Sequence, residues 1–420
     1  MTVLVVGAGP TGLTLGLDLA RRGVPVRVID KAPAYFSGSR GKGLQDRSLE
    51  VLADLGVRDE MLAEGQHSRS RLYVNREFSR EVDATALIIP QWKVEEALRD
   101  KLSVHGVKVE LDTELLALDG TTSQGRIDAD YIVGCDGGRS TVRKLLGVPF
   151  EGVSADGEHV MLLGDVEVSG LDSSIAHMWI GQGFYALTPF RTVPQWQVQI
   201  VTGDGSRLEP SLEVFQRLFD EMVGQPGVTL SNATWLSTYR VNVRMVRKFR
   251  VGNVFLAGDA AHVHPPAGGL GMNTGIQDAY NLGWKLAAVI NGEAGDKLLD
   301  TYELERLPIA EWTLDTSSER LQLITEAVQA GTGGIETGRK PEHAQLGLGY
   351  PDSPLSRNLV RWDGPAAGFR APWQESLRHQ DFTLLTFDDV RVLVRPDGHI
   401  GVVGGPSDDL TVATYLTDTL

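Results

Sequence analysis

Cysteine is almost absent from this chain of 420 residues, in which only Cys135 occurs. A single thiol excludes an intrachain disulfide, a dithiol redox centre and a cysteine-rich metal site. Long apolar runs are also lacking, because no stretch approaches the ~20 uninterrupted apolar residues of a membrane span. The apolar start MTVLVVGAGP runs into glycines without a basic leader or a cleavage site. We therefore expect no membrane association and a cytoplasmic location.

Positive charge is scarce as well. The chain has 40 Lys and Arg residues against 55 Asp and Glu residues, which gives a formal net charge of −15. This balance argues against nucleic acids and anionic membranes as partners. Hydrophobic residues make up 42% of the chain, as in an ordinary globular protein. The length predicts two or three domains.

Patterns for metal binding and for nucleophilic catalysis are missing too. His262 and His264 lie two positions apart beside Asp259, but no further histidine or cysteine cluster completes a ligand set. The nucleophile elbow G-x-S-x-G does not occur. We expect no metal site, and we name no catalytic side chain.

What the sequence does contain is a β-α-β unit at its start. Residues 2–6 are predicted to form a buried strand, 11–22 a helix with apolar side chains at helical spacing, and 24–30 the next strand. The glycine motif GAGPTG lies between the first strand and the helix. This order opens a doubly wound parallel sheet and therefore predicts an α/β fold.

The three glycines of GAGPTG match a dinucleotide-binding turn. Gly7 permits the tight turn, Gly9 lets the backbone approach a pyrophosphate, and Gly12 lets the helix pack on the strand. The helix N-terminus presents N–H groups to the phosphates, and Asp30 at the end of the second strand can hold a ribose diol. An acid there disfavours a 2′-phosphate, which leaves NAD or FAD. The candidate residues of this half of the site are Gly7, Gly9, Pro10, Thr11, Gly12, Asp30 and Lys31.

A second glycine-rich stretch, GDAAHVHPPAGGLGMNTG, covers residues 258–275. Asp259 follows a short apolar strand, at the end where ligands of open α/β sheets bind, and can accept hydrogen bonds from the ribityl chain of a flavin. The alternative is an aspartate that caps a helical turn. The glycines after the two prolines let bare backbone approach a flat ligand, and a helix from Met272 to about Ala288 directs its N–H groups at that ligand. A reduced isoalloxazine is anionic, so this terminus favours FAD over NAD. The candidate residues of this half are Gly258, Asp259, Pro266, Gly268, Gly269, Leu270, Gly271, Met272 and Asn273.

Between these two motifs the sequence changes to alternating strands over about 158–202, with one helix at 211–223. An antiparallel sheet domain inserted into the α/β domain is the simplest interpretation. A long helical tract follows at about 301–330, and residues 330–344 have the composition of a loop. The last eighty or so residues are predicted to form a small βαβ-like tail.

These motifs resemble the FAD-dependent aromatic hydroxylases, the group A flavoprotein monooxygenases of the p-hydroxybenzoate hydroxylase fold. The similarity is closest to the branch of polyketide and rifampicin hydroxylases and covers about residues 1–330. It rests on GAGPTG, on DYIVGCDGGRSTVRKLLG (130–147), on NVFLAGDAAHVHPPAGGLGMNTGIQDAYNLGWKLA (253–287) and on YELERLP (302–308).

The resemblance implies a Rossmann-like FAD-binding domain, an inserted antiparallel-sheet substrate domain and a short thioredoxin-like C-terminal domain. The expected bounds are 1–75, 92–157 and 250–330 for the FAD-binding domain, 76–91 and 158–249 for the substrate domain, and 341–420 for the tail. Because the tail has no cysteine, it is interpreted as a packing or oligomer surface, and a homodimer is possible.

The resemblance also implies roles for individual residues. Asp136 and Gly137 belong to a motif linked to both FAD and NAD(P)H, while Arg40 and Gln91 touch the FAD. Asp259 binds the ribityl chain, and Asn273 with the backbone of 268–272 holds the ring. Leu270 is a departure, because many relatives carry Gln at this position. The expected substrate-lining residues are Phe190, Gln197 and Gln199.

The function implied is that of an NAD(P)H- and O₂-dependent monooxygenase, which hydroxylates an aromatic or polyketide-type small molecule through a flavin C4a-hydroperoxide, in antibiotic biosynthesis or modification. FAD is bound tightly, whereas NADPH or NADH binds transiently. Three alternatives remain at this point: a flavoprotein of the same fold with Baeyer–Villiger or epoxidation chemistry, an NAD-dependent dehydrogenase, and a redox-inert binding protein.

Overall fold

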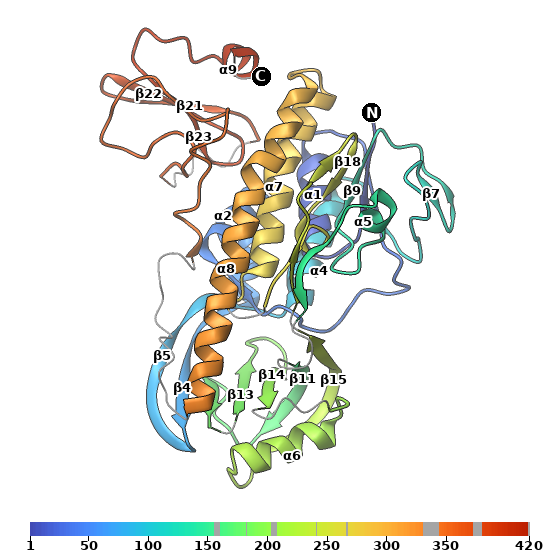
Figure 1. Cartoon of the computed structure of the whole chain (residues 1–420), viewed down its shortest axis with the longest axis vertical. Coiled ribbons are helices and arrows are strands. Elements are labelled where there is room, and N and C mark those ends of the chain that lie inside the picture. The colour runs from blue at the N-terminus through green and yellow to red at the C-terminus, as the bar shows by residue number, and fades with distance from the viewer. Residues whose placement is uncertain are drawn as a thin grey trace.

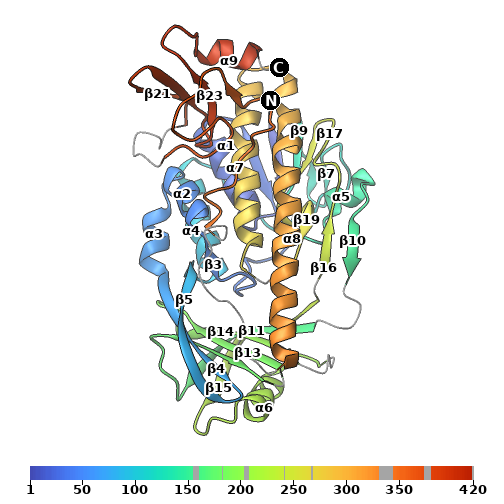
Figure 2. The same cartoon turned by 60° about the vertical axis from the view of Figure 1, so that its left-hand side comes forward.

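The computed structural model describes residues 1–154, 160–181, 183–202, 208–240, 242–265, 268–330, 344–372 and 380–418. It has three parts along its long axis (Figures 1 and 2): an α/β part in the middle, a large sheet at one end and the C-terminal segment at the other. Pro266 and most of the loop expected at 330–344 lie outside the described residues.

The middle part is built on a six-stranded sheet. Every residue of strands β1 and β9 is buried, as continuous apolar runs in a parallel sheet predict. All neighbours pair in parallel except β17 and β18, which are antiparallel. The strands in spatial order are β17 (Arg250–Val251), β18 (Val254–Leu256), β9 (Tyr131–Gly134), β1 (Val3–Val6), β2 (Val26–Ile29) and β6 (Val109–Glu110).

Helices surround this sheet, and α1 packs against both α4 and α7. The helices expected at 11–22, 46–55 and 92–105 are confirmed to within one residue at either end, because the apolar spacing identified the buried face of each. The elements are α1 (Pro10–Arg21), α2 (Asp46–Asp54), α3 (Arg58–Glu64), α4 (Gln91–Val104), α5 (Thr141–Leu146), η1 (Gly258–Ala260), α7 (Gly271–Ile290), η2 (Asp296–Leu299) and α8 (Asp300–Ala330).

The large sheet at one end has eight strands, and α6 (Leu212–Met222) covers one of its faces. Trp179, Tyr185, Phe215 and Phe219 form an aromatic core between them. Pairing is antiparallel throughout except between β12 and β4. The strands in spatial order are β15 (Thr229–Arg240), β11 (Val160–Ser169), β14 (Gln195–Thr202), β13 (Gly183–Pro189), β12 (Ala176–Ile180), β4 (Gln66–Val74), β5 (Glu77–Ile88) and β3 (Gly43–Leu44).

This sheet takes strands from two parts of the sequence. The strands after residue 158 form the antiparallel sheet that the alternating pattern predicted. Strand β4, which lies inside the range 1–75 expected for the FAD-binding domain, pairs with β5 in the same sheet. Two small sheets complete the middle part: β10 (Glu151–Ser154), β16 (Asn242–Met245) and β19 (His262–Val263), and β7 (Thr121–Thr122) with β8 (Gly125–Arg126).

The C-terminal segment forms a four-stranded mixed sheet with one short helix. It packs on α7, where Trp284 lies in one apolar cluster with Leu393, Val402 and Tyr415. Helix α8 runs from beside this segment to the large sheet, where it contacts β13 (Figures 1 and 2). The elements are β20 (Arg357–Asn358), β23 (Ile400–Gly404), β22 (Val390–Val394), β21 (Thr383–Phe387) and α9 (Val412–Asp418). Of the helices in the described ranges, none combines the length and apolar character that crossing a bilayer requires.

Candidate cofactor site

The two glycine turns, separated by some 250 residues in the sequence, meet in the fold at Thr11. A Cβ placed on Gly258 would lie 2.6 Å from Thr11 Oγ1, and one placed on Gly275 would lie 2.3 Å from the same atom. Since neither glycine has a Cβ, Thr11 sits directly against the backbone of both. The β1–α1 turn and the β18–α7 connection therefore form adjoining walls of one site.

Each glycine of the first turn has its own steric environment. Gly7 has φ +108°, and its Cβ would lie 2.4 Å from the Cys135 carbonyl oxygen. A Cβ on Gly12 would lie 1.9 Å from the Gly7 oxygen, whereas one on Gly9 meets no atom within 4 Å. Gly9 therefore leaves open space at the N-terminus of α1, where the first N–H groups of the helix have no partner within the helix.

Asp30 follows β2 and is held rigidly beside this turn. One carboxylate oxygen accepts from the Ala8 N–H at 2.8 Å, and the other accepts from the Ala32 N–H at 2.9 Å. Each oxygen retains a further lone pair for a ligand hydroxyl. The next residue, Lys31, is exposed.

The second turn places Asp259 on the surface of the site. Gly258 and Ala260 are buried, whereas Asp259 is exposed at the surface of the site. Desolvation of its carboxyl group by the surrounding protein raises its pKa. The residue that precedes η1 is Ala257, and no side chain caps this helical turn. Asp259 therefore does not cap this helical turn, which was the alternative that the sequence left open. Its carboxylate is available to a ligand.

The start of α7 has two glycines with left-handed backbone, Gly268 (φ +96°) and Gly269 (φ +63°). The helix begins at Gly271, one residue before the predicted start. The Leu270 side chain is fully buried, so only its backbone is available to a ligand at the position where the resemblance led us to expect Gln. Met272 is partly buried.

Asn273 is fully buried, and its side chain is engaged by the protein. The amide oxygen accepts from the Gln45 N–H at 2.8 Å, while the amide nitrogen donates to the Gly43 and Gly269 carbonyls at 3.0 and 2.7 Å. Asn273 therefore ties the chain at residues 43–45 to the helix start, and only its backbone can face a cofactor.

The Asp136–Gly137 motif forms a helix cap. Asp136 accepts from Ser140 Oγ at 2.5 Å and from the Thr141 N–H at 2.6 Å, and Ser140 caps α5 by accepting from the Arg143 N–H at 3.0 Å. Gly137 has φ +77°. These contacts cap the N-terminus of α5, and they leave Asp136 only partly buried.

The segment around Arg40 crosses between the middle part and the large sheet. Arg40 is exposed and stacks over Phe36 at 4.6 Å. Gln91 accepts from the Gly41 N–H at 2.9 Å and donates to Glu95 at 2.8 Å. Gln91 thus positions this segment, and burial raises the pKa of Glu95 to about 7.

Polar side chains of the large sheet hold the same segment. Gln197 is fully buried and donates to the Ser39 carbonyl, while the Ser39 N–H donates to Asp165 at 2.7 Å. Lys42 Nζ donates to Thr188 Oγ1 at 3.0 Å. Burial lowers the pKa of Lys42 to about 7 and raises that of Asp165 to about 6. Gln197 therefore positions this segment through its amide nitrogen, and its place in the substrate lining stays a prediction.

The other two expected lining residues are placed differently. Trp196 and Val198 pack toward α6, so Gln199, which alternates with them, faces the opposite side of the sheet, as Gln197 does. Gln199 is only partly buried and remains a candidate lining residue. Phe190 follows β13 and is buried.

Sequence reasoning gave no role to several side chains that organise the site. Asp278 accepts from the Gly258 N–H at 3.0 Å and lies 2.7 Å from His262 Nε2, and Arg306 donates to it at 2.7 Å. Asp278 and Arg306 lie in IQDAYNL and YELERLP, within the stretches that carry the family resemblance, so the sequence could have indicated their importance. Lys42 and Asp165 lie in no such stretch, and nothing in the sequence indicated theirs. Across the described residues, no group of three His, Cys, Asp or Glu side chains is arranged to hold a metal ion.

A strand–turn–helix with open space at Gly9, an acid after the second strand and a second glycine turn beside the first define an α/β protein that binds a dinucleotide. The residues fit FAD. The exposed Asp259 carboxylate suits the hydroxyls of a ribityl chain, and the N–H groups at the starts of α1 and α7 suit an anionic pyrophosphate and a flat ring that becomes anionic on reduction. The chain belongs to the FAD binding domain family, which matches residues 1–317.

The relatives agree with this assignment. A flavin-dependent monooxygenase of Mycobacteroides abscessus is 39% identical over 485 aligned positions, covering 99% of this chain and 99% of that protein. Rifampicin monooxygenase of Streptomyces venezuelae is 32% identical, covering 97% and 96%. The structure of OxyS, an anhydrotetracycline hydroxylase from Streptomyces rimosus, matches with a TM-score of 0.78 at 27% identity, covering 99% of each chain. The chain is therefore an FAD-dependent, NAD(P)H-consuming monooxygenase.

Proposed function

We propose that the adjoining glycine turns hold one FAD molecule from end to end. The meeting of both turns at Thr11 carries this proposal. The N-terminus of α1 and Gly9 bind the pyrophosphate, Asp30 binds the adenosine ribose, and Asp259 binds the ribityl chain. The backbone at Gly268–Gly271 and the N–H groups of α7 lie against the isoalloxazine.

We further propose that the substrate is a small aromatic or polyketide-type molecule and that O₂ is the co-substrate. The substrate lies between the flavin and the sheet face that carries Gln199. Segment 36–45 forms one wall of this compartment, since Gln197, Asp165 and Asn273 hold it in place. The bound cofactor would supply hydride uptake from NAD(P)H and oxygen transfer from O₂. The protein orients the substrate and excludes water.

The test is oxidation of NADPH and NADH by the purified protein with a panel of phenols and aromatic polyketides, followed by mass measurement of the products. We expect a yellow protein, faster NAD(P)H consumption with an accepted substrate, and a product that has gained one oxygen atom on an aromatic ring. An ester or an epoxide would instead identify Baeyer–Villiger or epoxidation chemistry. Reductant consumption without an oxygenated product across the panel would contradict the proposed substrate class.

A further inference from the structure

Arg306 connects the C-terminal segment with the second glycine turn. Its Nε donates to Asp278 at 2.7 Å, one terminal nitrogen donates to the Tyr350 hydroxyl at 3.0 Å, and the other donates to the Thr274 carbonyl at 3.3 Å. The side chain is fully buried. Because the guanidinium is planar, three partners on three sides fix its orientation.

Asp278 extends this connection to the backbone of the turn. Its second oxygen accepts from the Gly258 N–H at 3.0 Å and from His262 Nε2 at 2.7 Å. Although burial alone would raise the pKa of Asp278, Arg306 and His262 hold it below its ordinary value. Asp278 is thus an anionic acceptor for Gly258, which has φ +58° and immediately precedes Asp259.

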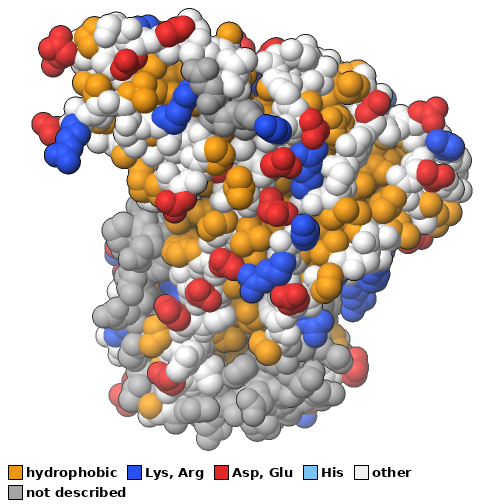
Figure 3. Space-filling view, turned by 45° about the horizontal axis from the view of Figure 1, so that its top comes forward, with side chains coloured by type: hydrophobic (Ala, Val, Ile, Leu, Met, Phe, Trp, Pro, Cys, Tyr) orange, Lys and Arg blue, Asp and Glu red, His pale blue; other side chains and the backbone are white. Residues whose placement is uncertain are grey.

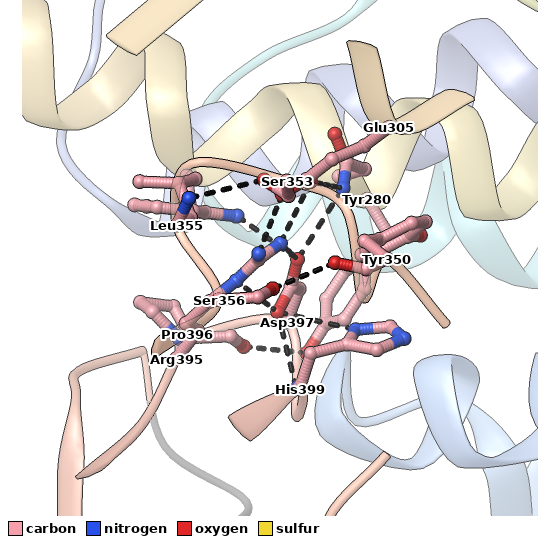
Figure 4. A network of polar contacts seen from close by, with 12 residues as sticks. Tyr280, Glu305, Tyr350, Ser353, Leu355, Ser356, Arg395, Pro396, Asp397 and His399 are labelled. Carbon is pink, nitrogen blue, oxygen red and sulfur yellow. Dashed lines mark hydrogen bonds and ion pairs between the residues drawn. The ribbon is translucent and has the colours of Figure 1, made fainter. Parts of the chain in front are cut away.

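Tyr350 is itself firmly held within the C-terminal segment. Its N–H donates to the Gly368 carbonyl at 2.8 Å, and the centroid of its ring lies 4.5 Å from the centroid of the His399 ring. Figure 4 shows Tyr350 beside the buried network of Arg395, Asp397 and His399. A rigid C-terminal unit therefore presents the hydroxyl to Arg306.

A second residue of this segment reaches the start of α7. The Gln345 amide oxygen accepts from Gln277 at 2.7 Å, and its amide nitrogen donates to Thr274 Oγ1 at 3.4 Å. Thr274 is also bound through its carbonyl by Arg306. The C-terminal segment is thus connected to two parts of the β18–α7 wall, the Gly258 turn through Arg306 and Asp278 and the α7 start through Gln345.

We propose that Tyr350 is a positioning residue for the flavin: through Arg306 and Asp278, it fixes the backbone of Gly258 and with it the carboxylate of Asp259. This inference rests on the proposed place of the ribityl chain at Asp259. It assigns a cofactor-related role to a segment that lies outside the matched FAD-binding region of residues 1–317.

The test compares Tyr350→Phe with Tyr415→Phe. Tyr415 is the matched control, since it is a buried tyrosine of the same segment whose hydroxyl donates to the Leu355 carbonyl at 2.7 Å. Each substitution removes one buried hydroxyl and retains the ring. The measurements are the melting temperature of the flavin-free protein, the Kd for FAD by titration, and the visible absorption spectrum of the bound flavin.

We expect similar decreases in melting temperature for both variants. Tyr350→Phe should raise the Kd for FAD about three- to tenfold, the range that the loss of one hydrogen bond produces, and should change the flavin spectrum. Tyr415→Phe should leave both unchanged within about twofold. Arg306→Lys, which retains a charge beside Asp278 but cannot bond to three partners, should weaken FAD binding at least as much as Tyr350→Phe.

Equal FAD affinity in Tyr350→Phe and Tyr415→Phe would overturn the inference, whether both are normal or both are weakened. Asp259→Ala separates this failure from failure of the proposed site. If Asp259→Ala weakens FAD binding and Tyr350→Phe does not, only the role of Tyr350 is wrong. If Asp259→Ala binds FAD as tightly as the parent, the ribityl chain lies elsewhere, and both the site and the inference fall.

Discussion

Gly9 and Gly12 belong to one motif but meet different surroundings. The Gly12 position has no room for a side chain, because Gly7 lies against it, whereas the Gly9 position opens into free space. A side chain at Gly12 therefore conflicts with the protein itself. A side chain at Gly9 conflicts only with what the protein binds. Gly12 is therefore required by the fold, whereas Gly9 is required by the cofactor.

At the scale of these residues we predict that one alanine substitution lowers the stability of the fold and that the other lowers the affinity for FAD. Gly12→Ala should destabilise the flavin-free protein by about 1–3 kcal/mol or more, the cost of overpacking. Gly9→Ala should stay within about 1 kcal/mol of the parent, because it exchanges one helix N-cap residue for a poorer one, but should raise the Kd for FAD at least about tenfold. Chemical denaturation without flavin and FAD titration measure the two effects. Normal FAD binding by Gly9→Ala would place the pyrophosphate elsewhere.

At the scale of elements, the contact of the C-terminal sheet with α7 and α8 contains buried charges. Arg395 donates to both oxygens of Glu305 at 2.6 and 2.9 Å, and Lys285 donates to Glu305 at 2.7 Å. Burial alone would raise the pKa of Glu305, but Arg395 and Lys285 hold it at about 2. A charge left without its partner in this contact would be strongly destabilising, so the elements separate only at a high cost in free energy.

His399 lies in the same network and makes this contact sensitive to acid. Burial lowers its pKa from 6.5 to about 4. The folded state therefore binds fewer protons than the unfolded state between these values, and stability decreases as the pH falls through this window. We expect the parent to lose about 2 kcal/mol between pH 7 and pH 4.5 through this group, since one unit of pKa corresponds to about 1.4 kcal/mol.

The measurement is urea denaturation of the parent and of His399→Gln at both pH values. The variant can be less stable than the parent at pH 7, but its further loss on acidification should be about 2 kcal/mol smaller. Titrating groups that do not contact His399 contribute nearly equally to both proteins and cancel in the comparison, whereas Asp397, which Arg395 also holds ionised, stays well below this pH window. An identical loss in the two proteins would show that the pKa of His399 is not lowered in the folded state.

At the scale of the whole molecule, α8 contacts all three parts of the structure. It contacts the large sheet near one end, carries Arg306 against the glycine turn, and carries Glu305 against the C-terminal segment. On the face shown in Figure 3, acidic and basic side chains are interspersed. The negative net charge is therefore not gathered into one field on that face.

We predict that deletion of residues 341–420 weakens both the fold and FAD binding. The deletion removes Arg395 from the buried Glu305 and uncovers Trp284, so several kcal/mol of stability should be lost, as when buried ion pairs are broken. It also removes Tyr350 from Arg306. Denaturation curves and FAD titration of the truncated chain test this expectation. Normal stability and normal flavin affinity of the truncated protein would contradict this prediction and would support the interpretation of the segment as a packing or oligomer surface.

The sequence by itself determined the order of the elements and the location of the two glycine turns. Apolar spacing identified the buried faces of α1 and α4, and the requirement for glycine where backbone approaches backbone identified Gly7 and Gly12. The apolar spacing and the contact of Gly12 with Gly7 are local, since they depend on neighbours within one or two turns of the chain, whereas Gly7 also lies against Cys135 of another strand.

Only the tertiary structure decided which polar side chains are already bound within the protein. Asn273 bonds to backbone some 230 residues away, Gln197 bonds to Ser39, and Tyr350 reaches Asp278 through Arg306. A buried amide or hydroxyl must find a partner, but the sequence does not show whether that partner is a ligand or a distant part of the chain. The choice depends on which elements the fold brings together, because hydrogen bonds form only over about 3 Å.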